Sequence, residues 1–155
     1  AQLGIKWVND LFCGGKKVSG ILTEAVIRDG KPAGIIVGTG INFATPPELL
    51  PAEVAGSLRD FLRPGASRNE VAAAMIREMR DHLPELVSDR SFLPGYRRRS
   101  ILLGRDIWVC PVGQEPYPAL AESIDEDAAL VICRNGRKIR LQTGEVSIRL
   151  PEQLR

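Results

Sequence analysis

The sequence Lys-Trp-Val-Asn-Asp at residues 6–10 opens the stretch from which the fold and the chemistry of this chain are best argued. The stretch continues as Lys-Val-Ser-Gly-Ile-Leu-Thr-Glu at residues 17–24 and ends as Gly-Thr-Gly-Ile-Asn at residues 38–42. Apolar, β-prone residues connect these polar clusters. Lys neutralises anions, Asn and Asp hold a nucleotide or its metal, and Gly lets a flat ligand touch backbone. The pattern therefore predicts a site that brings a carboxylate and a phosphate together.

The residues around these clusters predict antiparallel strands. Gly14-Gly15 is a two-residue hairpin signal, and the β-branched run Ile21–Ile27 ends at the turn signal Asp29–Pro32. The second run, Ala33–Phe43, is almost continuously apolar in its middle, which is typical of a strand covered on both faces. We therefore expect the first third of the chain to be a small antiparallel sheet.

The apolar spacing becomes helical after Pro51. One helix is expected from there to the stop at Pro64-Gly65, with an apolar face of Val54, Leu58, Phe61 and Leu62. Ser67 and Glu70 form a capping box for a second, amphipathic helix of about five turns. Its apolar stripe consists of Val71, Met75, Ile76, Met79, Leu83 and Leu86. A short third helix is expected near Phe92–Arg99.

The last third of the chain reads as β structure after a linker at residues 100–104. Asn135-Gly136 is a strong type I′ hairpin signal between two of the short strands. The expected strands are Asp106–Pro111, Tyr117–Ile124, Ala129–Cys133, Arg137–Leu141 and Glu145–Leu150. Five short strands at this spacing predict a small SH3-like barrel.

Composition excludes several functional classes. A net charge of +2 gives no electrostatic footprint for nucleic acid, and we expect no nucleic-acid partner. No apolar run reaches the roughly 18 residues of a membrane span, and the N-terminus does not read as a signal peptide. The three cysteines, Cys13, Cys110 and Cys133, lack metal-ligand spacing, so buried free thiols in a reducing, cytoplasmic compartment are expected.

Together, the three motifs in residues 6–42 resemble those of the biotin protein ligases, with Val8 where that family usually has Pro. Residues 144–149, Gly-Glu-Val-Ser-Ile-Arg, resemble the strand that closes the family's small C-terminal domain. The resemblance implies an α+β fold. Residues 1–100 would be the C-terminal portion of a biotin/lipoate ligase-like catalytic domain, with part of a class II synthetase-like mixed or antiparallel sheet. Residues 104–150 would be the SH3-like domain.

The resemblance also implies a reaction in two steps. ATP and biotin, with Mg²⁺, give biotinoyl-5′-AMP, and a lysine of a biotin carboxyl carrier domain, such as that of acetyl-CoA carboxylase, then takes the biotinoyl group. The family's Gly/Arg-rich biotin loop and the helix-turn-helix domain of some relatives are not found in this sequence. We therefore expect the C-terminal half of a ligase, inactive or very weak without an N-terminal half. An exposed sheet edge would favour a homodimer.

The resemblance assigns roles to individual residues. Lys17 is the catalytic lysine that contacts the biotin carboxyl and the adenylate phosphate. The expected biotin- and adenylate-binding residues are Lys17, Asn9, Asp10, Gly20, Gly38, Gly40, Asn42, Glu145 and Arg149, and no residue is assigned as a metal ligand. By residue type alone, each assignment has an alternative. Lys17 would be a solvated hairpin lysine, and Asn9-Asp10 an ordinary turn pair. The glycines would mark bulges or bends in the sheet, and Glu145 and Arg149 would form a cross-strand ion pair.

Two other functions remain open from the residues. A non-catalytic module of the same fold would dock a partner, and the charge run Arg97–Arg99 would then matter more than Lys17, although a solvated helix end is the default for such a run. A related lipoate or octanoyl ligase-transferase would share the chemistry. The Asn-Asp, Gly-Ile-Asn and Gly-Glu-Val-Ser-Ile-Arg motifs together favour biotin.

Overall fold

The computed structural model describes residues 2–50, 54–142 and 146–151, and the chain forms two compact units, Ala1–Gly65 and Ala66–Arg155. This division falls earlier than the domain boundary expected near residue 100. It groups the long helix with the C-terminal strands, and the functional domain boundary stays a prediction. The first unit contains a four-stranded sheet with two 3-10 helices, and the second contains two α-helices and a five-stranded sheet. The expected α+β fold class is therefore confirmed.

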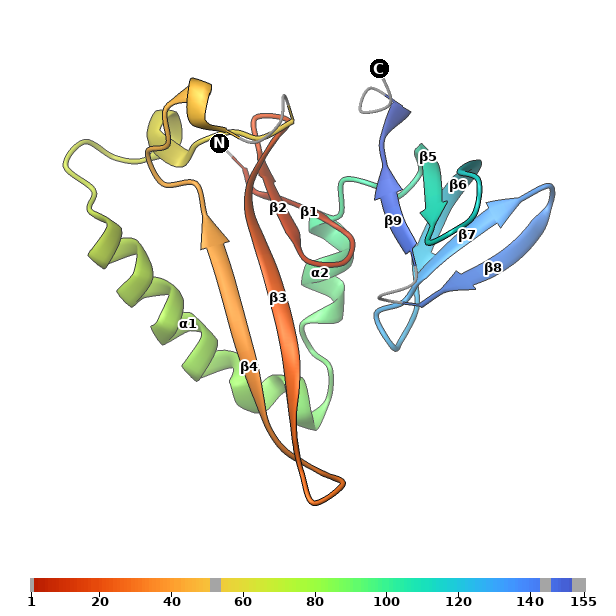
Figure 1. The fold of residues 1–155 in the computed structure, drawn as a ribbon, viewed down its shortest axis with the longest axis horizontal. Coiled ribbons are helices and arrows are strands. Elements are labelled where there is room, and N and C mark those ends of the chain that lie inside the picture. Colours follow the sequence, from red (N-terminus) through yellow and green to blue (C-terminus); the bar gives the residue numbers. More distant parts are fainter. Residues whose placement is uncertain (1, 51–53, 143–145, 152–155) are drawn as a thin grey trace. The chain divides into compact units, whose positions relative to one another are not determined.

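The first unit is built on a four-stranded antiparallel sheet in the order β1-β2-β3-β4 (Figure 1). The strands are β1 (Gly4–Lys6), β2 (Asp10–Cys13), β3 (Lys16–Arg28) and β4 (Lys31–Ile41). Gly14 and Gly15 have φ of 56° and 79°, and Asp29 and Gly30 have φ of 51° and 72°. Positive φ at both central residues matches the twist of a two-residue hairpin. The predicted hairpin at Gly14-Gly15 is therefore confirmed, and the turn signal at Asp29–Pro32 contains a second one at Asp29-Gly30.

The core of the first unit lies at the end of the sheet near the β2–β3 turn. Trp7, Phe12, Val18 and Ala55 are buried there. At the middle of β4 the neighbours Ile35 and Ile36, which lie on opposite faces of the strand, are 69% and 58% exposed. The expectation that this strand is covered on both faces is therefore not met within the described residues.

The expected helix after Pro51 is wrong over the part that can be described. Residues 51–53 lie outside the described residues, Val54 and Ala55 form a turn and an isolated bridge, and Leu58–Phe61 is a 3-10 helix. A second 3-10 helix spans Pro47–Leu49. Backbone hydrogen bonds from this segment go to β3 and to the end of β4 instead of along a helix. These tertiary hydrogen bonds override the apolar spacing.

The helices of the second unit agree with the sequence. Helix α1 (Arg68–Ser88) begins at the predicted capping box: the backbone N–H of Glu70 donates to Ser67 Oγ at 3.2 Å, and that of Ser67 donates to Glu70 Oε2 at 2.7 Å. These bonds satisfy two of the helix's N-terminal N–H groups. Helix α2 (Leu93–Arg99) is the expected short third helix.

Five antiparallel strands form the sheet of the second unit, in the order β8-β7-β6-β5-β9. They are β5 (Asp106–Pro111), β6 (Tyr117–Ile124), β7 (Leu130–Arg134), β8 (Arg137–Leu141) and β9 (Val146–Arg149). The last strand, β9, returns to pair with the first, β5. Ile107 and Val109 of β5 and Leu130 and Ile132 of β7 are almost fully buried. The predicted strands are confirmed, but among the described residues no pairing joins β8 to β9, so the expected barrel is not closed.

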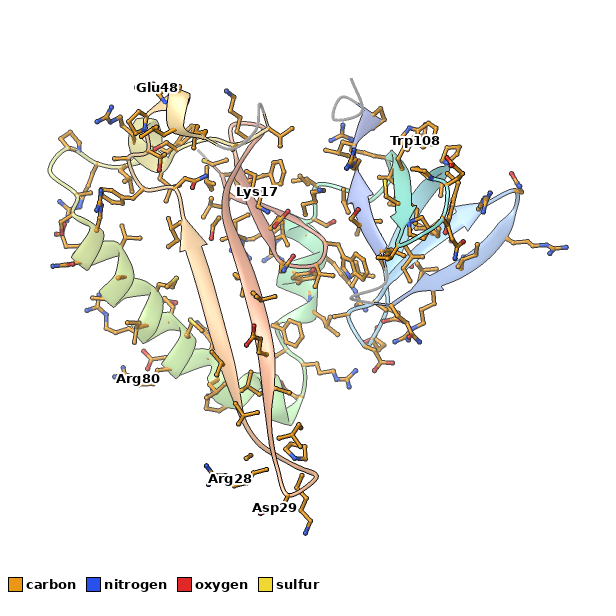
Figure 2. The ribbon with its side chains drawn as sticks, viewed as in Figure 1. Lys17, Arg28, Asp29, Glu48, Arg80 and Trp108 are labelled. Atoms are coloured by element: carbon orange, nitrogen blue, oxygen red, sulfur yellow. The ribbon has the colours of Figure 1, made fainter. Side chains whose placement is uncertain are left out.

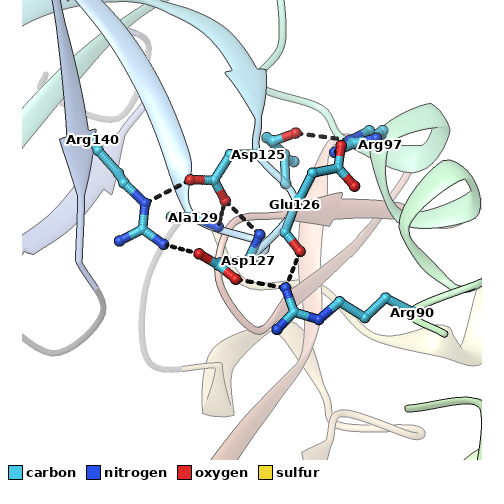
Figure 3. Close-up of polar contacts among 8 residues, drawn as sticks. Arg90, Arg97, Asp125, Glu126, Asp127, Ala129 and Arg140 are labelled. Carbon is cyan, nitrogen blue, oxygen red and sulfur yellow. Dashed lines mark hydrogen bonds and ion pairs between the residues drawn. The ribbon is translucent and has the colours of Figure 1, made fainter. Parts of the chain in front are cut away.

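The turn between β6 and β7 is held by three arginines from elsewhere in the second unit (Figure 3). Asp125 accepts the backbone N–H groups of Asp127 and Ala129 at 2.9 Å and pairs with Arg140 Nε at 2.6 Å. Arg90, before α2, pairs with Asp127 at 2.6 Å. Arg97 Nε donates to the carbonyl of Ile124 at 2.7 Å. The first arginine of the run Arg97–Arg99 thus ties α2 to the sheet of its own unit.

Candidate functional site

A β-bulge in the first unit decides which way Lys17 points. Asp10 is paired with Gly20 and Leu11 with Ser19, but the next pair is Phe12 with Lys17, so Val18 is an extra residue on β3. Side chains alternate between the faces of a strand, and simple alternation would place Lys17 on the face of Ser19. The extra residue instead moves Lys17 to the face of Gly20 and Asp10.

On that face the ammonium of Lys17 lies beside Gly20 and Asp10. Lys17 Nζ is 2.6 Å from Asp10 Oδ1, and the two side chains are 39% and 19% exposed. A Cβ on Gly20 would lie 3.4 Å from Asp10 Oδ1 and from Lys17 Cε and Nζ. The ion pair therefore orients the ammonium over bare backbone while leaving it within reach of solvent.

Two further glycines extend this bare surface. Gly40 is paired with Gly20, and Gly38 with Leu22, so all three glycines share the face of Lys17. The nearest atoms to a Cβ on Gly40 and on Gly38 would be the carbonyl oxygens of Gly20 and Leu22, at 4.0 and 3.8 Å, and neither glycine has a positive φ. Neither conformation nor internal packing among the described residues requires glycine there. The arrangement gives a flat strip of backbone on which a planar ring could lie.

The site lies at one end of the long β3–β4 hairpin. Figure 2 shows Lys17 near the β2–β3 turn, while Arg28 and Asp29 lie at the opposite end of the hairpin. The charged tip and the strip of glycines are thus separated along the strands. The end with Lys17 is the one that places a cation beside the strip of Gly20, Gly38 and Gly40.

Asn9 and Asn42 are both attached to β3, but in different ways. The side-chain amide of Asn9 donates to the carbonyl of Ile21, and the N–H of Ile21 donates back to the Asn9 carbonyl at 3.0 Å. The backbone N–H of Asn42 donates to the Val18 carbonyl at 2.9 Å. Asn9 therefore braces β3 with its own side chain, and Asn42 follows β4 directly beside the bulge.

The sequence reasoning missed the segment that holds Lys17 from the other side. The N–H of Lys17 donates to the Val54 carbonyl at 2.7 Å, and the N–H of Gly56 donates to the Lys17 carbonyl at 2.8 Å. The N–H of Leu58 donates to the Asn42 carbonyl at 2.8 Å. One signal was available, because Gly56 is a poor residue for the interior of the expected helix.

The remaining predicted site residues belong to the second unit. Glu145 lies outside the described residues. Arg149 is exposed on β9, directly opposite Trp108 of β5. Their expected role at the nucleotide, like the roles assigned to the residues of the first unit, stays a prediction.

Neither metal-binding clusters nor membrane spans emerge from the described part of the chain. No group of three or more His, Cys, Asp or Glu side chains in it is placed to hold a metal ion. None of its helices is long and apolar enough to cross a membrane. Cys13, Cys110 and Cys133 are free thiols; Cys13 is buried as expected, whereas Cys110 and Cys133 are half-buried.

Comparison with known proteins shows what these features are similar to. Residues 1–42, which include the bulge and all three glycines, match the Biotin/lipoate A/B protein ligase family. The chain is 30% identical over 153 residues to the Biotin–[acetyl-CoA-carboxylase] ligase of Mycobacterium tuberculosis, covering 94% of this chain and 53% of that protein. It is 29% identical to the Bifunctional ligase/repressor BirA of Escherichia coli, covering 98% of this chain and 48% of that protein.

Solved structures of biotin protein ligase have a similar fold. The apo structure of biotin protein ligase from Aquifex aeolicus matches with a TM-score of 0.79 at 23% identity, over 96% of this chain and 66% of that one. The same ligase in complex with biotin and ATP matches with a TM-score of 0.77 at 23% identity, over 96% and 62%. The chain spans about half the length of the curated relatives it matches. In sequence and in fold it is similar to part of the biotin protein ligases.

Proposed function

We propose that this chain carries part of the active site of a biotin protein ligase, the part that joins biotin to AMP. The observation that supports this most directly is the placement of Lys17 by the bulge, over the strip made by Gly20, Gly38 and Gly40. The ring system of biotin would lie on the glycines, and the ammonium would meet its carboxylate. A solved relative of the same fold is described in complex with biotin and ATP, which agrees with this choice of ligands.

The chemistry explains why a lysine is needed there. In the first step a carboxylate oxygen of biotin attacks the α-phosphorus of ATP, the bond from that phosphorus to the bridging oxygen breaks, and pyrophosphate leaves. Two anions must approach each other, so fixed positive charge at the point of contact lowers the barrier. Lys17 would supply this charge, because a flexible ammonium can follow charge as it moves from carboxylate to phosphate.

The second step consumes the mixed anhydride. The amine of an acceptor lysine attacks the biotinoyl carbonyl carbon, an amide bond forms, and AMP leaves with the bonding electrons. We propose a biotin carboxyl carrier domain as acceptor; the M. tuberculosis relative is named for acetyl-CoA carboxylase. Water would hydrolyse the anhydride, so the site must exclude water. Close packing of the bare backbone against the ring would contribute to this.

Mg²⁺ would add positive charge at the phosphates of ATP. Magnesium is usually held by one or two carboxylates together with substrate phosphates, and Asp10 is the carboxylate at this site. Asp10 is already paired with Lys17, so a metal would arrive with the nucleotide and share that carboxylate. The donor set thus fits a metal bound mainly through ATP.

A titration with biotinoyl-5′-adenylate, followed by calorimetry, tests the proposal. The wild-type chain is expected to bind, and Lys17→Ala to lose binding. Lys31→Ala is the matched control, because Lys31 is an exposed lysine at the opposite end of the same hairpin. Absence of wild-type binding at millimolar ligand, or equal binding by Lys17→Ala, would refute the proposed site.

The matching family also includes lipoate ligases, so lipoyl-adenylate is the second candidate ligand. The same titration with lipoyl-adenylate separates the two. Biotin is the proposed ligand because the matching relatives described above are biotin ligases. Tighter binding of the lipoyl compound would reassign the substrate while leaving the site where it is.

A further inference from the structure

We propose that the segment Val54–Gly56 is a positioning element for Lys17, and that Gly56 is the residue that makes it possible. The inference rests on the proposed function, in which Lys17 supplies the ammonium of the active site. It concerns residues that lie outside the sequence motifs and that the sequence analysis assigned to a helix without any contact to Lys17.

β3 begins before its pairing with β4 does, which leaves its first residues without a β4 partner. β4 pairs with β3 only from Ser19 onward, so it does not reach Lys17. The N–H and C=O of Lys17 would therefore lack partners on that side, and unpaired backbone groups are costly away from water. Val54 and Gly56 fill the gap with hydrogen bonds of 2.7 and 2.8 Å, as a one-residue parallel bridge between Lys17 and Ala55.

Close approach, not backbone conformation, requires glycine at position 56. A Cβ there would lie 2.6 Å from Lys16 Cβ and 3.3 Å from Lys16 Cδ. Gly56 does not have a positive φ. Because the nearest atom is the Cβ of Lys16, next to its backbone, rotation of the side chain cannot relieve the contact. Either the segment or β3 must move.

Movement at this point changes the direction of Lys17. Lys16 and Lys17 are neighbours at the start of β3, and both backbone hydrogen bonds of the bridge involve Lys17. A displaced bridge would release the backbone of Lys17, and its ammonium would no longer be fixed beside Asp10 and Gly20. We expect Gly56→Ala to weaken binding of biotinoyl-5′-adenylate by about tenfold to a hundredfold, the size of losing one hydrogen bond to a charged group.

A rescue experiment separates this mechanism from general damage to the fold. Lys16→Gly removes the Cβ that Gly56→Ala would meet, whereas Lys16→Ala keeps it. Binding should therefore recover in the double variant Lys16→Gly/Gly56→Ala and stay weak in Lys16→Ala/Gly56→Ala. Both single Lys16 variants are measured to give the baselines. Gly34→Ala, where a Cβ meets nothing within 4 Å, controls for the substitution itself.

Hydrogen exchange at the Lys17 amide gives a second readout that needs no ligand. This amide should exchange slowly in the wild type, faster in Gly56→Ala, and slowly again only in the double variant with Lys16→Gly. Unaltered exchange and binding in Gly56→Ala, or equal rescue by Lys16→Ala, would overturn the inference. If the wild type binds no adenylate, the proposed function fails while the exchange pattern still decides the role of the segment.

Should Gly56→Ala fail to fold, Ser57→Ala tests the same idea without added atoms. Ser57 Oγ donates to the Phe43 carbonyl at 3.1 Å and so ties the segment to the residues after β4. Losing this bond should speed exchange at the Lys17 amide and weaken adenylate binding in a chain with unchanged circular dichroism. Unchanged exchange in Ser57→Ala would count against a positioning role.

Discussion

Gly40→Ala should make this protein more stable and, at the same time, poorer at binding its proposed ligand. Gly40 lies in β4 with ordinary φ, and an added Cβ would meet no atom closer than the Gly20 carbonyl oxygen at 4.0 Å. Glycine inside a strand is less stable than alanine by about 0.5–1 kcal/mol, because its unfolded backbone has more freedom to lose. For a chain of this size that gain corresponds to a rise in Tm of about 1–4 °C.

The ligand should respond in the opposite direction. If the biotin ring lies against the backbone of Gly20 and Gly40, the new methyl group occupies its place. Adding a methyl group to a packed contact costs about 1–3 kcal/mol. Since 1.4 kcal/mol is about a factor of ten in affinity, the Kd should rise by about fivefold to 150-fold.

Thermal unfolding and calorimetric titration with biotinoyl-5′-adenylate measure the two effects. Gly34→Ala is the matched control, six residues earlier on the same face of β4 and about 20 Å away at 3.3 Å per residue. It should raise Tm in the same way and leave the Kd unchanged. A Gly40→Ala chain that binds as well as the wild type would refute the placement of the ring on the glycines.

Three further predictions concern the second unit. Hydrogen bonding to Arg140 lowers the pKa of Asp125 below its ordinary value of 3.8. The stability that this carboxylate contributes is therefore present above pH 3.8 and is lost as the pH falls through its folded pKa. The free energy of unfolding should accordingly fall more steeply with decreasing pH in the wild type than in Asp125→Asn. Burial raises the pKa of Tyr96 from 10.0 to about 12, so stability present below pH 10 is lost as the pH rises toward 12, and Tyr96→Phe should resist alkaline unfolding better. Ser67→Ala removes half of the capping box and should cost about 1 kcal/mol in the free energy of unfolding, measured by urea denaturation, whereas Ser67→Asp should cost little.

Local chemistry made much of the fold predictable. The turns at Gly14-Gly15 and Asn135-Gly136 and the capping box at Ser67 depend on residues next to one another, and each is found where the sequence placed it. The segment that includes Val54 and Leu58 was predicted wrongly because its apolar spacing fits a helix. Its backbone is instead hydrogen-bonded to β3 and to Asn42, partners more than ten residues away in the sequence.

The candidate site shows the same limit. Motif resemblance pointed to Lys17 and to the glycines, and alternation alone correctly puts Gly20, Gly38 and Gly40 on one face. Alternation alone would have put Lys17 on the other face, because it takes no account of the extra residue at Val18. That extra residue depends on pairing with β2 and on the hydrogen bonds from Val54 and Gly56. The direction of Lys17 at the bulge depends on β2, β3 and the Val54–Gly56 segment together, so no local pattern in the sequence contains it.

The strength of the Lys17–Asp10 pair fits a lysine that must change partners. An ion pair with one side chain 39% exposed is worth only about 0–1 kcal/mol, because water screens it. A buried pair would hold the ammonium so tightly that an incoming carboxylate would gain little by replacing Asp10. Here the pair sets the direction of the side chain at small energetic cost, and a ligand with two anionic groups can then take over the ammonium. Asp10→Asn should accordingly leave thermal stability almost unchanged and weaken adenylate binding less than Lys17→Ala, whereas binding lost as completely as in Lys17→Ala would mean that Asp10 itself contacts the ligand or its metal.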